Sequence, residues 1–95
     1  MNILLIFLAL VAGTTNAEQH PNQTQVREWV AAGDMLSLDV ILQRHPINGE
    51  LLDAEIEWED ERLVYELKWL DSAGLRHETY IDAKSGDWIE EEIDD

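Results

Sequence analysis

The 95-residue sequence contains no cysteine, and its six lysine and arginine residues face 21 acidic ones. Without cysteine the chain can form no disulfide, no thiolate zinc site, no cysteine nucleophile and no anchor on a lipidated cysteine. The formal charge of -15 argues against binding to nucleic acid or to an anionic membrane surface, since both need basic side chains. Disorder is also excluded, because 45% of the residues are hydrophobic and four are tryptophan. The length allows one small domain.

The first 17 residues have the pattern of a secretory signal peptide. A short apolar run, residues 3–11, is followed by small and polar residues that end in Thr15-Asn16-Ala17. We expect cleavage after Ala17, and no stable membrane anchor afterwards, because even the whole uncharged stretch is shorter than the roughly 20 apolar residues of a helical span. Export without disulfides is more typical of bacteria than of eukaryotes. The expected location is therefore the bacterial periplasm or the external medium.

After the predicted cleavage site, residues 18–24 are expected to form a polar tail. A helix then begins, with an N-cap at Asn22 supported by Gln25 or at Thr24 supported by Glu28. Apolar residues recur after this cap at the spacing of one helix face.

A second short helix is predicted to begin after Ser37 and to end near Arg44 or His45, because Pro46 follows. Neither helix is long enough to be stable alone. Both must therefore pack an apolar face against another element.

From residue 50 onward the hydrophobic period changes from helical to alternating, which predicts β-strands. If Asp60-Glu61 is a two-residue hairpin loop, opposing residue numbers add up to 121. Apolar residues then face one another in the pairs Ala54–Leu67, Ile56–Tyr65, Trp58–Leu63 and Leu52–Trp69, and Glu55 faces Glu66. Asp-Glu is a poor dipeptide for such a turn. Trp58 and Trp69 are expected to fill the core under the helices.

Two further strands are predicted, over residues 75–82 and 87–93, separated by turns at 71–74 and 83–86. To keep Ile81 on the core face, the loop at 71–74 must hold an odd number of residues or include a bulge, which Gly74 can provide. The predicted fold class is α+β, a helical hairpin packed on one face of a four-stranded antiparallel meander sheet. It forms a single domain over residues 25–95.

Three segments resemble the second half of a PepSY domain: Leu63-Val-Tyr-Glu-Leu-Lys-Trp69, Asp71-Ser-Ala-Gly74 and Glu78-Thr-Tyr-Ile-Asp-Ala-Lys-Ser-Gly86. The residues at matching places are Tyr65, Gly74, Ile81, Asp82, Ala83, Ser85 and Gly86, and Trp88 stands where valine is more usual. The resemblance covers roughly residues 35–93. The matching turn also has a physical explanation, because the Asp82 carboxylate can accept hydrogen bonds from the backbone of Lys84 and Ser85.

The chain shows no catalytic or cofactor-binding pattern. The three histidines are dispersed, without the spacing of a metal site, and no phosphate-binding glycine loop occurs. We therefore expect neither an enzyme, nor a cofactor, nor a dedicated metal site. The resemblance instead implies a small exported binding module that modulates or inhibits a secreted peptidase or contacts another envelope protein.

The candidate partner surface is the sheet face turned away from the helices, with a neighbouring tryptophan. Its residues are Asp53, Glu55, Glu57, Glu59, Glu66, Tyr80 and Trp88. Charge on such a surface speeds association with a basic partner, and aromatic residues add affinity, although acidic residues also simply keep a protein soluble. The alternative is an envelope sensory or accessory protein, or weak binding of divalent cations at the hairpin tip, residues 57–61, or the C-terminal tail, residues 90–95.

Overall fold

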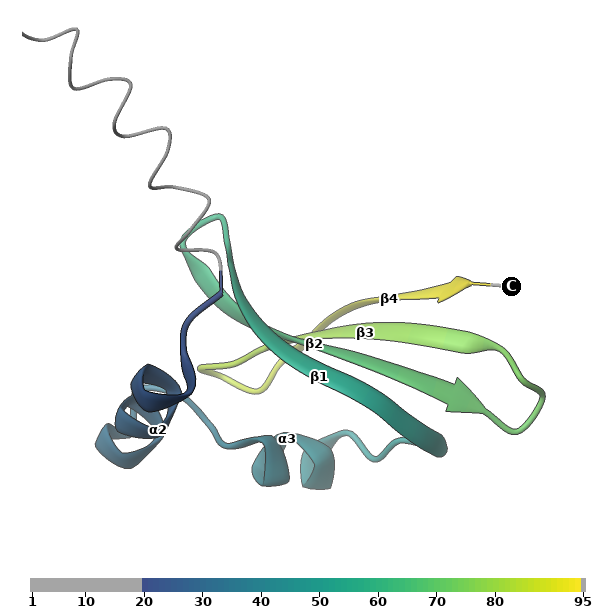
Figure 1. Cartoon of the computed structure of the whole chain (residues 1–95), viewed down its shortest axis with the longest axis horizontal. Helices are drawn as coiled ribbons and strands as arrows, with labels where there is room; N and C mark the ends of the chain where they lie inside the picture. Colours follow the sequence, from purple (N-terminus) through teal and green to yellow (C-terminus); the bar gives the residue numbers. More distant parts are fainter. Residues whose placement is uncertain (1–19, 95) are drawn as a thin grey trace, which may run out of the picture.

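The computed structural model describes residues 20–94 and shows two helices followed by a four-stranded antiparallel sheet (Figure 1). The elements are α2 (Gln23–Ala32), α3 (Leu38–Arg44), β1 (Gly49–Glu59), β2 (Arg62–Asp71), β3 (Arg76–Asp82) and β4 (Trp88–Asp94). The strands lie side by side in chain order, which confirms the predicted α+β meander. The predicted signal peptide falls outside the described residues, and no described helix is long and apolar enough to cross a membrane.

Both helices begin at side-chain caps that the sequence indicated. Asn22 and Gln25 form a reciprocal capping box: the Asn22 side chain accepts from Gln25 N at 2.8 Å, and the Gln25 side chain accepts from Asn22 N at 3.1 Å. Of the two predicted caps the chain therefore uses Asn22, so α2 begins inside the segment expected to be a tail. Ser37 caps α3 by accepting from Val40 N at 3.3 Å.

The β1–β2 hairpin has the predicted two-residue loop and nearly all of the predicted register. Ala54, Ile56 and Trp58 face their expected partners, and Glu55 faces Glu66. The pairing of Leu52 with Trp69 is wrong, because a bulge at Leu52 shifts the register and brings Leu51 opposite Trp69 instead.

The β2–β3 connection confirms the expected odd loop. Asp71 N donates to Leu75 O at 2.9 Å, which leaves three residues in the loop, and Gly74 takes a left-handed φ of 87°. Tyr65 therefore lies opposite Ile81 and Leu67 opposite Thr79. The odd number of loop residues places Ile81 on the core face, where it is fully buried.

The core lies between the sheet and the two helices, which sit on the same side of it (Figure 1). Its buried members are Met35, Ile41, Tyr65, Leu67, Ile81 and Ala83. Burial raises the pKa of Tyr65 to about 12, and its hydroxyl donates to Leu36 O at 2.8 Å. Trp69 packs against this core as expected.

Trp58 differs from the expectation of a core tryptophan, because 40% of it remains exposed. It lies close to the hairpin tip, where the only aromatic ring paired with it among the described residues is that of Trp29, edge to face at 6.1 Å between centroids.

Candidate functional site

The sheet face away from the helices carries most of the acidic strand residues. The registers align Asp53, Lys68, Glu78 and Glu92 in one row and Glu55, Glu66, Tyr80 and Glu90 in the next. Glu57 and Glu59 continue the same side of β1, because strand residues alternate between faces. We call these ten residues the acidic face. It holds eight acidic side chains and a single lysine. Arg62, opposite Glu59, and Arg76, which pairs with Glu78 at 4.0 Å, lie on the same side of the sheet, so acidic residues still outnumber basic ones there.

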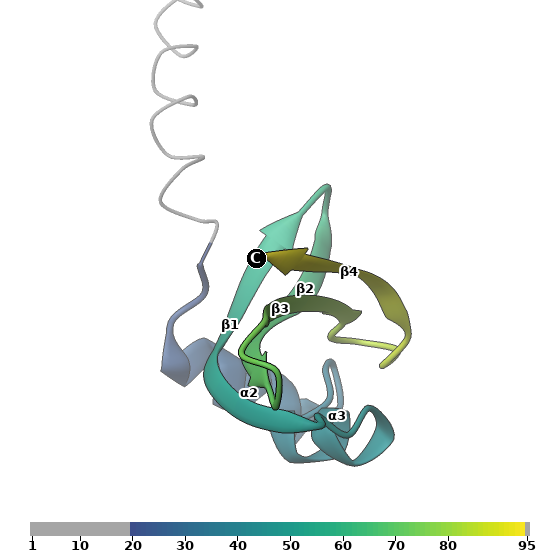
Figure 2. The same cartoon turned by 90° about the vertical axis from the view of Figure 1, so that its right-hand side faces the viewer.

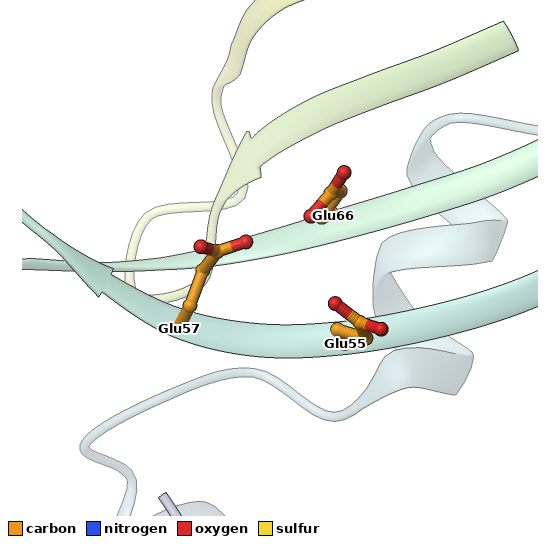
Figure 3. A group of neighbouring side chains, drawn as sticks. All are labelled: Glu55, Glu57 and Glu66. Carbon is orange, nitrogen blue, oxygen red and sulfur yellow. The ribbon is translucent and has the colours of Figure 1, made fainter. Parts of the chain in front are cut away.

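Three carboxylates of the acidic face converge, as Figure 3 shows. Oxygens of Glu55, Glu57 and Glu66 lie within 4.8 Å of one another. Glu55 and Glu66 are direct partners across the β1–β2 pair, and Glu57 is the next residue on the same side of β1. The structure therefore brings together three of the predicted partner residues, with their acceptor oxygens on one side of the sheet.

Two central positions of this side of the sheet are buried, and one of them is Glu66, a residue of the predicted partner surface. Val64 is 2% exposed and Glu66 is 9% exposed, although both helices lie on the other side of the sheet (Figure 1). The cause is the strong twist and curl of the sheet (Figure 2). Side chains from all four strands line a hollow of about 240 Å³ over Val64, among them Glu59, Tyr80 and Ile89.

Burial and neighbouring charges raise the pKa values of two residues of the acidic face, Glu66 and Tyr80. Burial raises the pKa of Glu66 above its ordinary value, and the neighbouring Glu57 raises it further. The Tyr80 hydroxyl lies 3.2 Å from a Glu66 oxygen and 3.1 Å from a Glu78 oxygen, so its single proton is shared between the two acceptors. Burial, followed by the charge of Glu66, raises the pKa of Tyr80, which keeps this hydroxyl protonated as a donor.

Trp88 stands apart from the other predicted partner residues. It pairs with the core residue Ile81 across a register shift in the β3–β4 ladder. It is 51% exposed, as expected, but the six remaining residues of the predicted surface lie together on the acidic face without it.

The turn that carries the family resemblance has the predicted geometry. The Asp82 carboxylate accepts from Lys84 N at 2.8 Å and from Ser85 N at 2.9 Å, and these backbone bonds lower the pKa of Asp82 against the opposing effect of burial, which is larger than either bond alone. Gly86 has a φ of 82°, and a Cβ there would meet Arg44 Nη1 at 2.6 Å.

Hydrogen bonds join the same turn to α3 and to the linker that precedes it. Leu36 N donates to Ala83 O at 2.8 Å, and the Arg44 guanidinium donates to Ser85 O at 2.9 Å. With Tyr65 in the core and Gly74 in the preceding loop, the motif residues act in this structure as folding devices.

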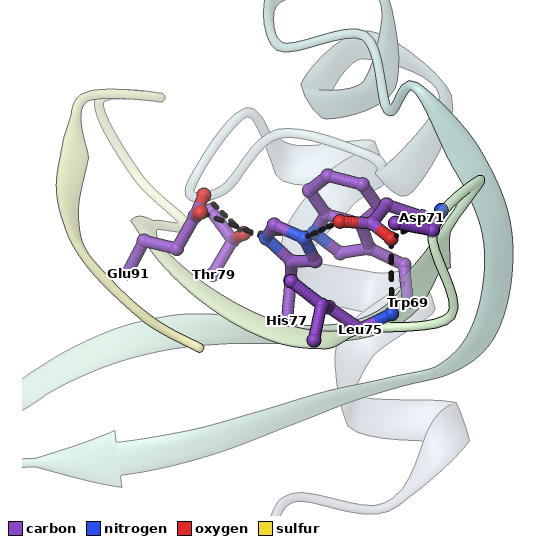
Figure 4. A network of polar contacts seen from close by, with 7 residues as sticks. Trp69, Asp71, Leu75, His77, Thr79 and Glu91 are labelled. Atoms are coloured by element: carbon purple, nitrogen blue, oxygen red, sulfur yellow. Dashed lines mark hydrogen bonds and ion pairs between the residues drawn. The ribbon is translucent and has the colours of Figure 1, made fainter. Parts of the chain in front are cut away.

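A second polar cluster lies on the helix side of the sheet, and the sequence analysis missed it (Figure 4). His77, 8% exposed, has Asp71 Oδ2 at 2.8 Å from Nε2 and Glu91 Oε2 at 2.9 Å from Nδ1. The Trp69 ring stacks on the imidazole with centroids 3.9 Å apart. The sequence indicates part of this cluster, because the alternation of β3 places His77 and Thr79 on the core face with Ile81. The position of Glu91 is not indicated, because it depends on the β3–β4 register.

The C-terminal tail proposed as a cation site is divided by the strand that it forms. Glu90 and Glu92 belong to the acidic face, whereas Glu91 pairs with Thr79 and is bound by His77 on the opposite side. The tail acids up to residue 94, where the described part of the chain ends, therefore do not converge on one ligand. The acidic group that does converge, Glu55 with Glu57 and Glu66, includes one residue of the proposed hairpin tip.

No protein-family model, curated protein or solved structure matches this chain.

Proposed function

We propose that this protein is a small, exported, non-catalytic binding module whose acidic face docks on a basic surface of an envelope or secreted protein. The resemblance to PepSY domains makes a peptidase the first partner class to test. The observation that carries the proposal is the convergence of Glu55, Glu57 and Glu66, whose oxygens lie within 4.8 Å of one another.

Like charges held so close favour a cationic group that would neutralise them. Burial raises the pKa of Glu66, and the nearby Glu57 raises it further, because both disfavour its ionised form. A partner lysine or arginine placed there would gain charge-assisted hydrogen bonds to several oxygens. The hollow over Val64 is lined mostly by polar side chains, Arg62 among them, but Val64 and Ile89 add a small apolar contact beside the charges. Such a surface combines rapid electrostatic association with a small apolar anchor.

The test uses the chain recovered after export, whose mass also reports whether residues 1–17 are gone. We expect the immobilised chain to capture a peptidase from the native envelope fraction, and salt to weaken the complex, because exposed charges are screened. Removing two charges with Glu55→Gln and Glu57→Gln should slow association severalfold. The matched control removes two charges on the exposed side of the helices, with Glu28→Gln and Asp39→Asn.

Recovery of no peptidase, or equal association rates for the two double variants, would contradict the proposal. The same three carboxylates could instead hold a hard divalent cation, which prefers carboxylate oxygens. Calorimetry with calcium and with magnesium separates the two interpretations, because a dedicated cation site requires binding tighter than about 1 mM.

A further inference from the structure

The His77 cluster joins three strands at the end of the sheet that lies far from the β1–β2 hairpin tip. Asp71 is the last residue of β2, His77 lies in β3 and Glu91 lies in β4. Figure 4 shows the imidazole between the two carboxylates, with the Trp69 indole against its face. The network continues from Trp69 Nε1 to Thr79 Oγ1 at 3.0 Å and from Thr79 Oγ1 to Glu91 Oε1 at 3.3 Å.

The geometry requires a proton on each ring nitrogen. A carboxylate accepts hydrogen bonds and donates none, whereas a neutral imidazole has one donor and one acceptor nitrogen. Both nitrogens of His77 face carboxylate oxygens at 2.8 and 2.9 Å. Only the imidazolium, with two N–H groups, satisfies both contacts.

We propose that His77 is a doubly protonated latch that holds the edge strand β4 on the sheet, and that loss of the proton on Nδ1 to solvent releases β4. The proposal does not depend on the acidic face or on its partner.

The two carboxylates differ in how firmly they are held, and this difference decides which contact breaks. Asp71 Oδ1 also accepts from Ala73 N at 2.8 Å and from Leu75 N at 2.9 Å. Glu91 has one further donor, the Thr79 hydroxyl at 3.3 Å. When the imidazole is neutral, its remaining proton stays on Nε2, toward the anchored Asp71. The Nδ1 lone pair then faces Glu91 and repels it.

The charged groups that face His77 set the pH range of the latch. From β2 the group is Asp71 and from β4 it is Glu91, while Trp69 and Thr79 are neutral. Hydrogen bonds to Asp71 and then to Glu91 raise the pKa of His77 above its ordinary 6.5, against the opposing effect of burial. A raised pKa in the folded protein means that the latch is fully closed below pH 6.5 and opens as the pH rises from there through the folded pKa.

The test follows the histidine and the strand separately in the full exported chain. A ¹⁵N NMR titration gives the pKa and protonation of the imidazole, and hydrogen exchange gives protection factors for β4 amides, corrected for intrinsic rates. Between pH 6.5 and the folded pKa of His77 we expect β4 protection to fall by up to tenfold per pH unit. Protection in the β1–β2 pair should stay constant.

The variant Glu91→Gln removes one of the two carboxylates and should move the His77 pKa toward 6.5 and flatten the pH dependence of β4 protection. Its matched control, Glu92→Gln, removes the same charge from the opposite side of the same strand, where it pairs with Glu78, and should leave both unchanged. A His77 pKa at or below 6.5, β4 protection that does not follow the His77 titration, or equal behaviour of the two variants would overturn the latch.

Discussion

The hairpin tip offers a direct test of how much backbone strain lowers the stability of this fold. Asp60 and Glu61 have φ angles of 50° and 66°, the left-handed conformation that a type I′ turn requires at both loop positions. For a residue with a Cβ this conformation costs about 1–2 kcal/mol, and aspartate tolerates it better than glutamate. Most of the strain is therefore expected at Glu61.

Replacing Glu61 by glycine should relieve that strain. Glycine has greater freedom in the unfolded chain, which offsets about 0.5–1 kcal/mol of the gain. We expect the free energy of unfolding to rise by about 0.5–1 kcal/mol, which corresponds to an increase in melting temperature of roughly 2–8 °C for a domain of this size.

The measurement is urea denaturation followed by tryptophan fluorescence, with Glu61→Gln as the control. Glutamine removes the same charge but keeps the Cβ and therefore the strain. Backbone strain at Glu61 is refuted if Glu61→Gly is no more stable than Glu61→Gln, because any gain would then come from the lost charge.

Two further substitutions test the core and the acidic face. Ile41 is fully buried in α3, so Ile41→Ala should lower the free energy of unfolding by about 2–5 kcal/mol. The control Gln43→Ala, on the exposed side of the same helix, should change it by less than about 0.5 kcal/mol. Equal effects of the two substitutions in urea denaturation would contradict the assigned core. Because the pKa of Glu66 is raised above 4.5 in the folded protein, its ionisation makes stability fall as the pH rises from 4.5 through the folded pKa. Glu66→Gln should therefore raise the free energy of unfolding, relative to the parent chain, more at pH 7 than at pH 4. Denaturation curves of both chains at the two pH values measure this, and the reverse order would show that ionised Glu66 does not destabilise the fold.

The strand pairing could be predicted from the sequence because it depends on local features. Alternation assigns each side chain to a face, and a two-residue loop then allows one register, so the partners of Ile56 and Trp58 followed directly. The odd loop before β3 followed from the need to bury Ile81. The caps at Asn22 and Ser37 are likewise local signals.

The features that could not be predicted depend on the curvature of the sheet and on contacts between distant residues. Alternation gives the side on which Val64 and Glu66 lie, but the curl that buries them is a property of the whole sheet. The bulge at Leu52 carries no glycine or other sequence signal. The contact between His77 and Glu91 requires the β3–β4 register, which is itself interrupted between Tyr80 and Ile81.

The structure divides the acidic excess into carboxylates that accept from backbone N–H groups and carboxylates that face one another. Asp71 and Asp82 each accept from two backbone N–H groups. Both pKa values are lowered, that of Asp71 first by its hydrogen bond with His77 and then by the backbone. These two acids stabilise turns, which is a sufficient reason for their presence. Glu66 differs, because its pKa is raised by burial and by Glu57, and its directly paired neighbour on β1 is another glutamate. Its hydrogen bond from Tyr80 and the charge of Lys68 oppose this rise without cancelling it. Folding alone would favour an apolar or amide side chain at that position, and this is the cost that the cationic partner proposed above would offset.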